Sequence, residues 1–419
     1  MGRIFATFIV ALSVCIVVGC DGGGGSHGDP LFVYLTWRGD TSTTMTVNFQ
    51  TEAAYPSISV AYRLVPDDGG DAGAFSEVDV LDSWRLDHHK SRRWVHGVEL
   101  VDLTPGGKYE FSVLLNMATL DQSGSHFFRT LPDEPNAPIR FINGGDMDVG
   151  TAAETLMQFA SLEDPMFALI GGDVVYVDES PAMEALEDRW DTWFRRWESI
   201  MRTSEGCLVP LVMVLGDHEM DTVDPYAGGV DQVEFFLDFF DQNEEAAEQS
   251  YFARTFGANL VIYVLDSGNA ISHAGQREWL RGQMTQFAGI PHQFAAYHHP
   301  LYPVAKPFDD PVASVWAIRG REEWGPLFDE FGLDTAFEHD GHLFKQTYRL
   351  KAGVVDPTGT LYLGEGAFGQ KQRPPQERDF VETSGGIQHF WSVVVDDLGA
   401  TYTAIDINGA AFHTYPAMP

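Results

Sequence analysis

The sequence has few basic residues, few cysteines and no apolar run of bilayer length. Lysine and arginine number 26 against 61 aspartates and glutamates, so the formal net charge of the 419 residues is −35. Proteins that follow nucleic-acid phosphates carry the opposite balance, which excludes nucleic-acid binding by a basic face. Because such an acidic chain repels anions, phosphate chemistry would need cations held locally. Cys15, Cys20 and Cys207 are too few for a disulfide framework.

The first twenty residues have the pattern of an export signal. Arg3 precedes an apolar run from Ile4 to Val18, which is shorter than the ~20 residues of a membrane span. The run ends in Val-Val-Gly-Cys at Cys20, which resembles the lipobox of bacterial lipoproteins. Residues 21–30 then predict a flexible tether. We expect an exported protein, anchored in the membrane of the cell envelope by a lipid on Cys20. The alternative is an ordinary cleaved signal peptide over residues 1–20 and a secreted protein.

Residues 31–132 predict an all-β sandwich. Apolar side chains alternate with a period of two, as at Met45, Val47 and Phe49, and about seven such runs occur in about 100 residues. The turn Leu-Thr-Pro-Gly that starts at Leu103 leads to Tyr109, and this segment resembles the tyrosine corner of a fibronectin type III domain. A sandwich of this kind indicates no chemistry by itself.

Residues 138–415 predict an α/β domain. The stretch LPDEPNAP separates it from the sandwich, and apolar strands then alternate with helical segments. The helix expected over 183–201 carries an aromatic stripe that we interpret as core packing. The later runs LYLGEG, FWSVVVDD and TYTAIDI are expected to end the sheet layer in antiparallel strands. The earlier strands are expected at Ile139–Asn143, Phe167–Ile170, Leu208–Leu215, Leu260–Leu265, Gln293–Tyr297 and Thr335–Glu338.

Five of these strands are followed directly by residues of the metal-ligand types. The five segments are GGDMD at Asp146, GGDVVY at Asp173, GDHE at Asp217, YHHP at His298 and EHDGH ending at His342. Strand ends converge in an α/β sheet, and a carboxylate between two cations can bridge them. An isolated Gly-Asp pair is more often a turn or a helix cap. Five in succession indicate a metal centre, whereas Asp266 has no motif partner and is interpreted as structural.

The order of these motifs resembles that of the metallophosphoesterases, which have GDxx, GDxxY, GNHE, VxxHxPxY and GHxH. The tyrosine variant is similar to purple acid phosphatases, whose plant type also has a fibronectin-like domain before the catalytic one. Gln276-x-x-Trp279-Leu280 and Gly364-Glu365-Gly366 add local support. The resemblance implies a four-layer αββα sandwich after the N-terminal domain, and metal-dependent hydrolysis of phosphate esters.

The resemblance also implies two metal ions, iron, manganese or zinc. The first ion would take Asp146, Asp173, Tyr176 and His342, and the second would share Asp173 and take Asp217, His298 and Asp340. Asp217 stands where the family has asparagine, and Asp340 where it has histidine. Because oxygen ligands favour hard cations, we expect manganese or ferrous iron at the second position. Three alternatives stay open: His339 in place of Asp340, His299 in place of His298, and Asp148 as a further ligand of the first ion.

The mechanism implied by the resemblance is attack by a bridging hydroxide on phosphorus. His218 would contact the phosphate and help to stabilise or protonate the leaving group, although it could instead orient a ligand. We expect a phosphomonoesterase, with diester hydrolysis as a variant, acting outside the cytoplasm. The alternative is a surface lipoprotein whose fibronectin-like domain binds a partner and whose second domain is catalytically weak, because of Asp217 and Asp340.

Overall fold

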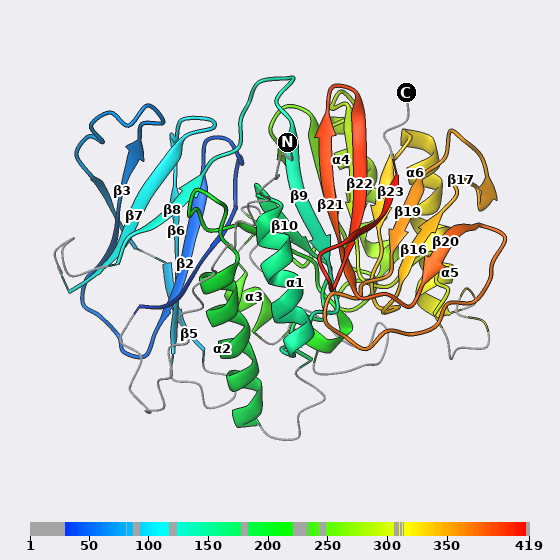
Figure 1. Cartoon of the computed structure of the whole chain (residues 1–419), viewed down its shortest axis with the longest axis horizontal. Coiled ribbons are helices and arrows are strands. Elements are labelled where there is room, and N and C mark those ends of the chain that lie inside the picture. The colour runs from blue at the N-terminus through cyan, green and yellow to red at the C-terminus, as the bar shows by residue number, and fades with distance from the viewer. Residues whose placement is uncertain are drawn as a thin grey trace, which may run out of the picture.

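The computed structural model describes residues 30–415, apart from 81, 87–92, 117–123, 177–182, 221–232, 234, 241, 244–248, 306–309, 311 and 313. The expected signal peptide, Cys20 and nearly all of the tether lie outside the described residues. Two regions follow each other along the chain, an all-β region at one end of the molecule and an α/β region at the other (Figure 1).

The N-terminal region is a sandwich of two four-stranded antiparallel sheets, with strand orders β1-β2-β6-β5 and β4-β3-β7-β8. The Tyr109 hydroxyl accepts a hydrogen bond from the Thr104 N–H at 2.7 Å, which is the geometry expected of a tyrosine corner. The short outer strands β4 and β5 were not expected from the period-two runs. The strands are β1 Leu31–Thr36, β2 Met45–Thr51, β3 Ile58–Val65, β4 Ser76–Asp79, β5 Asp82–Arg85, β6 Trp94–Leu100, β7 Lys108–Leu115 and β8 His126–Arg129.

The second region contains two larger sheets. The six-stranded sheet has the order β11-β10-β9-β21-β22-β23, and the seven-stranded sheet has the order β12-β13-β14-β15-β19-β16-β20. A hairpin of β17 (Leu350–Lys351) and β18 (Val354–Val355) is separate. The six-stranded sheet comprises β9 Ile139–Gly144, β10 Phe167–Ile170, β11 Leu211–Met213, β21 His389–Asp396, β22 Gly399–Asp406 and β23 Ala411–Tyr415. The seven-stranded sheet comprises β12 Phe252–Phe256, β13 Leu260–Val264, β14 His292–Ala296, β15 Thr335–Phe337, β16 Phe344–Thr347, β19 Leu361–Gly364 and β20 Val381–Gly385.

Two expectations about strands need correction. The run from Leu208 to Leu215 forms a strand only over Leu211–Met213, because Leu208 makes an isolated bridge to Arg202 instead of joining the sheet. The run LYLGEG was expected to be antiparallel, but β19 pairs in parallel with β15 and antiparallel with β16. FWSVVVDD and TYTAIDI form the antiparallel pair β21 and β22, as expected.

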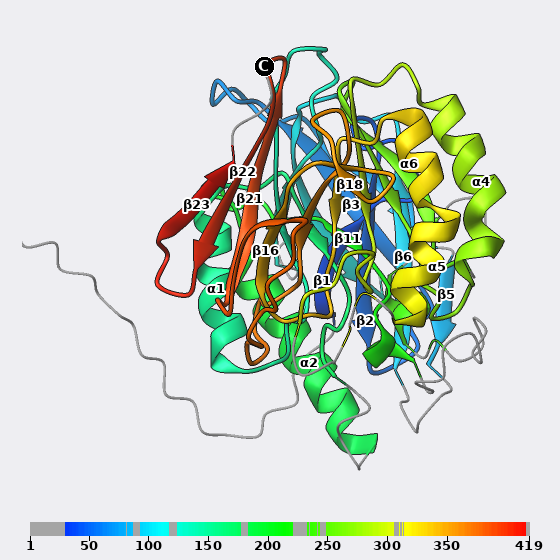
Figure 2. The ribbon, with the colours of Figure 1, turned by 90° about the vertical axis from the view of Figure 1, so that its right-hand side faces the viewer.

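Helices cover both outer faces of the paired sheets, which gives the four-layer α/β architecture (Figure 2). Alternate residues explain the layering: Phe141 and Phe167 point between the sheets, while their neighbours Ile142 and Ala168 pack under α1 and α2. On the other side of the paired sheets, Trp324 lies in the core between the seven-stranded sheet and the helices that cover it. The helices are α1 Thr151–Leu162, α2 Met183–Ile200, α3 Phe236–Phe239, α4 His273–Gln286, α5 Val315–Glu323 and α6 Gly325–Phe331.

The aromatic stripe of α2 lies in the contact between the two regions. Trp190, Trp193 and Trp197 are buried, and the ring of Phe194 packs at a tilt against Tyr34 of β1, with 4.8 Å between ring centroids. The stripe is therefore core packing, as the sequence predicts. Cys207 is also buried and forms no disulfide within the described part of the chain. Among the helices of that part, none has both the length and the hydropathy that crossing a bilayer requires.

Candidate metal centre

The motif residues follow strands whose carboxyl ends meet at one edge of the two sheets. Strands β9, β10 and β11 run parallel in one sheet, and β13, β14 and β15 run parallel in the other. Asp146, Asp173 and Asp217 come after the first three strands, whereas His298 and Asp340 come after β14 and β15. Parallel strands place their ends together, so segments distant in sequence form one site.

The first cluster consists of Asp146, Asp173 and His342, whose ligand atoms lie within 4.8 Å of one another. His342 Nε2 is 3.1 Å from Asp146 Oδ1. The Tyr176 hydroxyl lies 3.2 Å from the same oxygen and 3.0 Å from His342 Nε2. Asp146, Asp173 and Tyr176 are almost completely buried. A cation at this point would therefore be enclosed by two carboxylates, one imidazole and one phenol.

The second cluster consists of Asp217, His298, His299 and Asp340, again within 4.8 Å of one another. His298 Nε2 lies 3.0 Å from Asp217 Oδ1 and 3.3 Å from Asp173 Oδ1. Asp173 thus contacts a member of the second cluster while it belongs to the first. The side chains of Asp217 and Asp340 are 25% and 34% exposed, so this cluster opens to solvent on the carboxylate side.

The structure distinguishes between Asp340 and His339, which the sequence left open. His339 Nδ1 lies 2.9 Å from the Tyr297 carbonyl oxygen, and its Nε2 lies 3.3 Å from Asn143 Nδ2. These contacts direct the imidazole into the sheet, whereas Asp340 lies in the second cluster. His298 and His299 both lie in that cluster, so the structure brings both alternatives to the second position.

Asp148 and Asp266, two further aspartates near the strand ends, are engaged elsewhere. Asp148 forms an ion pair with Arg189 of α2 and belongs to neither cluster. Asp266 is buried, and its carboxylate accepts hydrogen bonds from the Ser250 hydroxyl at 2.6 Å and from the Asn269 N–H at 2.7 Å. The interpretation of Asp266 as structural is confirmed.

The backbone at both clusters is strained. Asp146, Asp173, Tyr176, Asp340 and His342 all have positive φ angles, between 52° and 65°. Non-glycine residues rarely adopt this conformation, and such outliers concentrate at functional sites because the surrounding structure must hold them in place.

Two glycines allow these residues to approach one another. Gly172 has a φ of +89°, and a Cβ there would lie 2.6 Å from the Gly216 nitrogen. Gly366 has a φ of +51°, and a Cβ there would lie 1.7 Å from Asp146 Oδ2. The sequence signals GGD and Gly-Glu-Gly thus have a direct steric reason.

The pKa values of the acidic groups shift in both directions here. Neighbouring histidines outweigh burial and lower the pKa of Asp146, Asp217 and Asp340. Burial raises the pKa of Asp173, and the charges of Asp217 and Asp146 add to this rise against the opposing effect of His298. Burial also raises the pKa of the Tyr176 hydroxyl well above its usual range, and the charge of Asp146 adds to it. Burial alone would lower the pKa of His298, but Asp173 outweighs it and raises this pKa well above the ordinary value. An excess of negative charge is thus concentrated where few cationic side chains lie.

Unpartnered polar atoms show that the residues fit cations. His298 Nε2, His299 Nε2 and Asp217 Oδ1 are buried, and none of these atoms makes a hydrogen bond within the described residues. His298 Nε2 and Asp217 Oδ1 are only 3.0 Å apart, yet their geometry is not that of a hydrogen bond. Buried polar groups are normally paired, so these lone pairs converge on a shared point as metal ligands do.

His218 lies beside both clusters. Its backbone N–H donates to Asp173 Oδ1 at 3.0 Å, and its ring is 4.3 Å from the Tyr176 ring. His218 Nε2 is 3.8 Å from Asp173 Oδ2, and the side chain is 22% exposed. The imidazole therefore lies at the solvent side of the site, within reach of a bound anion.

Sequence reasoning missed Glu219, the last residue of GDHE. Its buried carboxylate accepts hydrogen bonds from the N–H groups of Asp173 at 2.8 Å, Val174 at 2.7 Å and Gly216 at 3.0 Å. Burial, with the charge of Asp173, raises its pKa to about 7. Glu219 thus ties the Asp173 loop to the Asp217 loop.

The buried Lys345 was also not predicted from the sequence. Its ammonium donates to Glu338 Oε2 at 2.6 Å, to Glu365 Oε1 at 2.8 Å and to the Tyr302 carbonyl at 2.8 Å. Glu338 Oε1 in turn accepts from the Leu301 N–H at 2.7 Å. This network connects the segment after His299 with the segment before His339. Glu338 and Glu365 lie in motifs that the sequence shows, but no motif marks Lys345.

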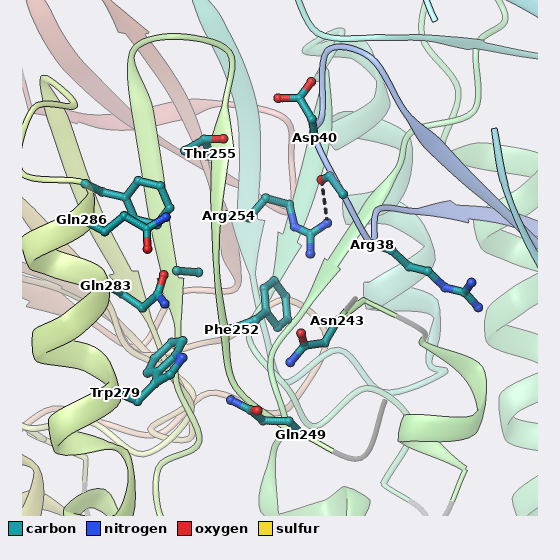
Figure 3. Close-up of a pocket in the computed structure, with 13 residues that line it drawn as sticks. Arg38, Asp40, Asn243, Gln249, Phe252, Arg254, Thr255, Trp279, Gln283 and Gln286 are labelled. Carbon is teal, nitrogen blue, oxygen red and sulfur yellow. Dashed lines mark hydrogen bonds between the residues drawn. The ribbon is translucent and has the colours of Figure 1, made fainter. Parts of the chain in front are cut away.

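A cavity of about 300 Å³ lies elsewhere, at the boundary between the two regions (Figure 3). Trp279 and Gln283 of α4 form one wall, and Arg38 and Asp40 of the N-terminal sandwich lie across from them. Arg254 donates a hydrogen bond to the Gly39 carbonyl at 3.2 Å and so ties β12 to the sandwich. The cavity includes no residue of either cluster.

Comparison with known proteins identifies the paired sheets and polar strand ends as a metallophosphoesterase fold. Residues 30–130 match the purple acid phosphatase N-terminal domain, and residues 145–338 match the calcineurin-like phosphoesterase domain. The chain therefore combines a purple acid phosphatase N-terminal domain with a calcineurin-like phosphoesterase domain.

Individual relatives agree with this assignment. Purple acid phosphatase 15 of Arabidopsis thaliana is 24% identical over 309 residues, which cover 67% of this chain and 54% of that protein. The chain thus spans about half the length of the curated relative it matches. Purple acid phosphatase PPD1 from yellow lupin seeds superimposes with a TM-score of 0.78 at 16% identity, over 93% of this chain and 74% of that one. The structure of PhoD gives a TM-score of 0.66 at 10% identity, over 95% and 94% of the two chains.

Proposed function

We propose that this protein hydrolyses phosphate esters, preferentially monoesters, at a centre of two metal ions. The observation that carries the proposal is the pair of adjoining clusters, with Asp173 in the first and 3.3 Å from His298 of the second. The family assignment supports hydrolysis of a phosphoester. Two ions bound in these clusters would supply a hydroxide nucleophile near neutral pH and would offset the charge of the phosphoryl oxygens.

The side chains have distinct tasks in this reaction. Asp146, Tyr176 and His342 enclose the buried position, and Asp173 connects it to the second one. Asp217 and Asp340 lie at the solvent side, where substrate enters. His218, also partly exposed, donates a hydrogen bond to the phosphoryl group or a proton to the leaving oxygen.

The carboxylates of the second cluster favour hard cations. Asp217 and Asp340 bring the carboxylates of the two clusters to four, with Asp146 and Asp173. Four carboxylates match the charge of two divalent ions, and their oxygen atoms favour the harder manganese and ferrous ions over zinc. We propose manganese or iron(II) there, with zinc as a poorer substitute.

A hydrolysis assay tests this function directly. The purified protein would be stripped of metal, loaded with manganese, iron(II) or zinc, and assayed with p-nitrophenyl phosphate and with bis(p-nitrophenyl) phosphate. We expect manganese-dependent or iron-dependent turnover, faster on the monoester. Binding of two ions without turnover on either ester would contradict the proposal and favour the alternative of a catalytically weak surface protein.

We also propose that the protein acts outside the cytoplasm, anchored by a lipid on Cys20. The support is the sequence pattern of the first twenty residues, because that segment lies outside the described residues. Membrane extraction and mass spectrometry of the N-terminal peptide would test it, with Cys20→Ser as the variant. A lipid-modified Cys20 is expected, and an unmodified N-terminus beyond residue 20 would refute the anchor.

A further inference from the structure

The second cluster holds one imidazole more than the sequence motifs imply. His298 occupies the histidine position of VxxHxPxY, yet His299 lies in the same cluster with Asp217 and Asp340. We propose that His299 is itself a ligand of the second metal ion. The inference rests on the proposed function, since it concerns the same pair of ions.

The distances from His299 fit neighbours around one ion. His299 Nε2 lies 3.8 Å from Asp217 Oδ1, which is longer than a hydrogen bond. An imidazole binds an ion through one of its nitrogens, and a single ligand atom from each of Asp217, His298, His299 and Asp340 lies within 4.8 Å of the others. Ligand atoms about 2.1 Å from a shared ion lie about 3 to 4 Å from one another, depending on the angle between them. The two aspartates and the imidazole therefore surround a space of ionic size.

The environment of His299 holds its imidazole in place but gives its Nε2 no partner. The side chain is 7% exposed, and Nε2 makes no hydrogen bond within the described residues. The backbone N–H donates to the Ser267 hydroxyl at 2.9 Å, and the ring packs on Trp316 with centroids 4.5 Å apart. A buried, oriented nitrogen without a partner is what a metal ligand requires before the ion binds.

The extra ligand changes the character of the second ion. With His299, its ligand residues are Asp173, Asp217, His298, His299 and Asp340, one more than the four residues of the first ion. Five protein ligands exceed the tetrahedral set of a zinc site and suit the octahedral preference of manganese or ferrous iron. His299 also supplies a second imidazole where Asp340 replaces the expected histidine.

Metal binding to two variants of the full chain tests this assignment. His299→Ala removes the proposed ligand, and His292→Ala, at the opposite end of β14, is the matched control. Calorimetric titration of the metal-free proteins with Mn²⁺ is expected to show two ions in the control and in the wild type. In His299→Ala, the second ion should bind at least tenfold more weakly. Two ions with unchanged affinities in His299→Ala would overturn the proposal. If the metal affinities of His299→Ala are unchanged but this variant binds inorganic phosphate more weakly than the wild type, His299 contacts the anion and not the ion.

X-ray absorption on the manganese-loaded wild type avoids any dependence on a variant that fails to fold. Three imidazoles per two ions are expected, from His298, His299 and His342. Two imidazoles per two ions would refute the role of His299 while leaving the two-ion centre intact. A wild type that binds no metal would instead contradict the proposed function.

Discussion

The two clusters differ in how their side chains are already satisfied. In the first, Asp146, Tyr176 and His342 contact one another at 3.0 to 3.2 Å and are shielded from solvent. In the second, His298 and His299 leave buried nitrogens unpartnered, and the aspartates are partly exposed. We therefore propose that the first cluster retains its ion, and that the second receives an ion and the substrate.

The difference between the two clusters follows from the segments of the chain that form them. The first cluster draws on β9, β10 and the buried loop before β16, and Gly366, which follows β19, lets the backbone approach Asp146. The second lies on the solvent side of the shared Asp173. The comparison predicts that substitutions affect metal content, turnover and stability to different extents, depending on which cluster they touch.

The largest effect is expected from Asp173→Ala, because this carboxylate serves both positions. Hydrolysis should fall on the order of 10³-fold, and content of both ions should drop. Asp148→Ala is the matched control, since Asp148 is a nearby carboxylate paired with Arg189. Metal analysis showing two ions and normal turnover in Asp173→Ala would refute its bridging role.

A smaller effect is expected from His218→Asn. Turnover should fall about 100-fold through loss of a proton donor or phosphate contact, while both ions remain bound. Steady-state kinetics with metal analysis checks this. If His218 only orients a ligand, activity and metal content should instead decline together.

A change in metal preference is expected from Asp217→Asn combined with Asp340→His. Fewer carboxylates should raise activity with zinc relative to manganese about tenfold, since imidazole suits zinc better than it suits hard cations. Reconstitution of wild type and double variant with each metal, side by side, provides the measurement. An unchanged ranking of metals would mean that Asp340 does not bind the second ion.

The smallest effect on hydrolysis is expected from a histidine outside both clusters. Burial lowers the pKa of His389 to about 4, whereas carboxylates raise the pKa of His298. Unfolded chains take up a proton at His389 below about pH 6.5, so its contribution to stability is present above that pH and is lost as pH falls toward 4.

His389→Gln should therefore reduce the acid sensitivity of stability, by about 2 kcal/mol between pH 7 and pH 5. Urea unfolding of the metal-free wild type and variant at both pH values measures this. Turnover of the two metal-loaded proteins at pH 7 should be the same. Equal losses of stability in the two proteins would show that His389 is not the group that titrates.

Much of the fold could be predicted because it depends on local pattern. Period-two alternation predicted most strands of the sandwich, apolar runs predicted those of the second region, and the aromatic stripe predicted α2. The exceptions arise from tertiary pairing: Leu208 leaves the sheet for a bridge to Arg202, and β19 pairs in parallel with β15. Neither partner is encoded in the segment itself.

The candidate site could be predicted where the spacing of a motif fixes the position of a residue. This spacing predicted Asp146, Asp173 and Asp217 at adjoining strand ends, and their role as metal ligands stays a prediction. The sequence could not decide between Asp340 and His339. Which of these neighbouring side chains points to the second cluster depends on the positive φ of Asp340. Lys345 was missed because its partners, Glu338 and Glu365, meet only in the folded chain.

We propose that the two unequal clusters act together on a phosphate ester. Stepwise addition of Mn²⁺ to the metal-free protein, with hydrolysis of p-nitrophenyl phosphate followed at each step, is the decisive experiment. We expect negligible hydrolysis up to one bound equivalent and a steep rise between one and two. Full activity at one equivalent, or no hydrolysis at two, would contradict it.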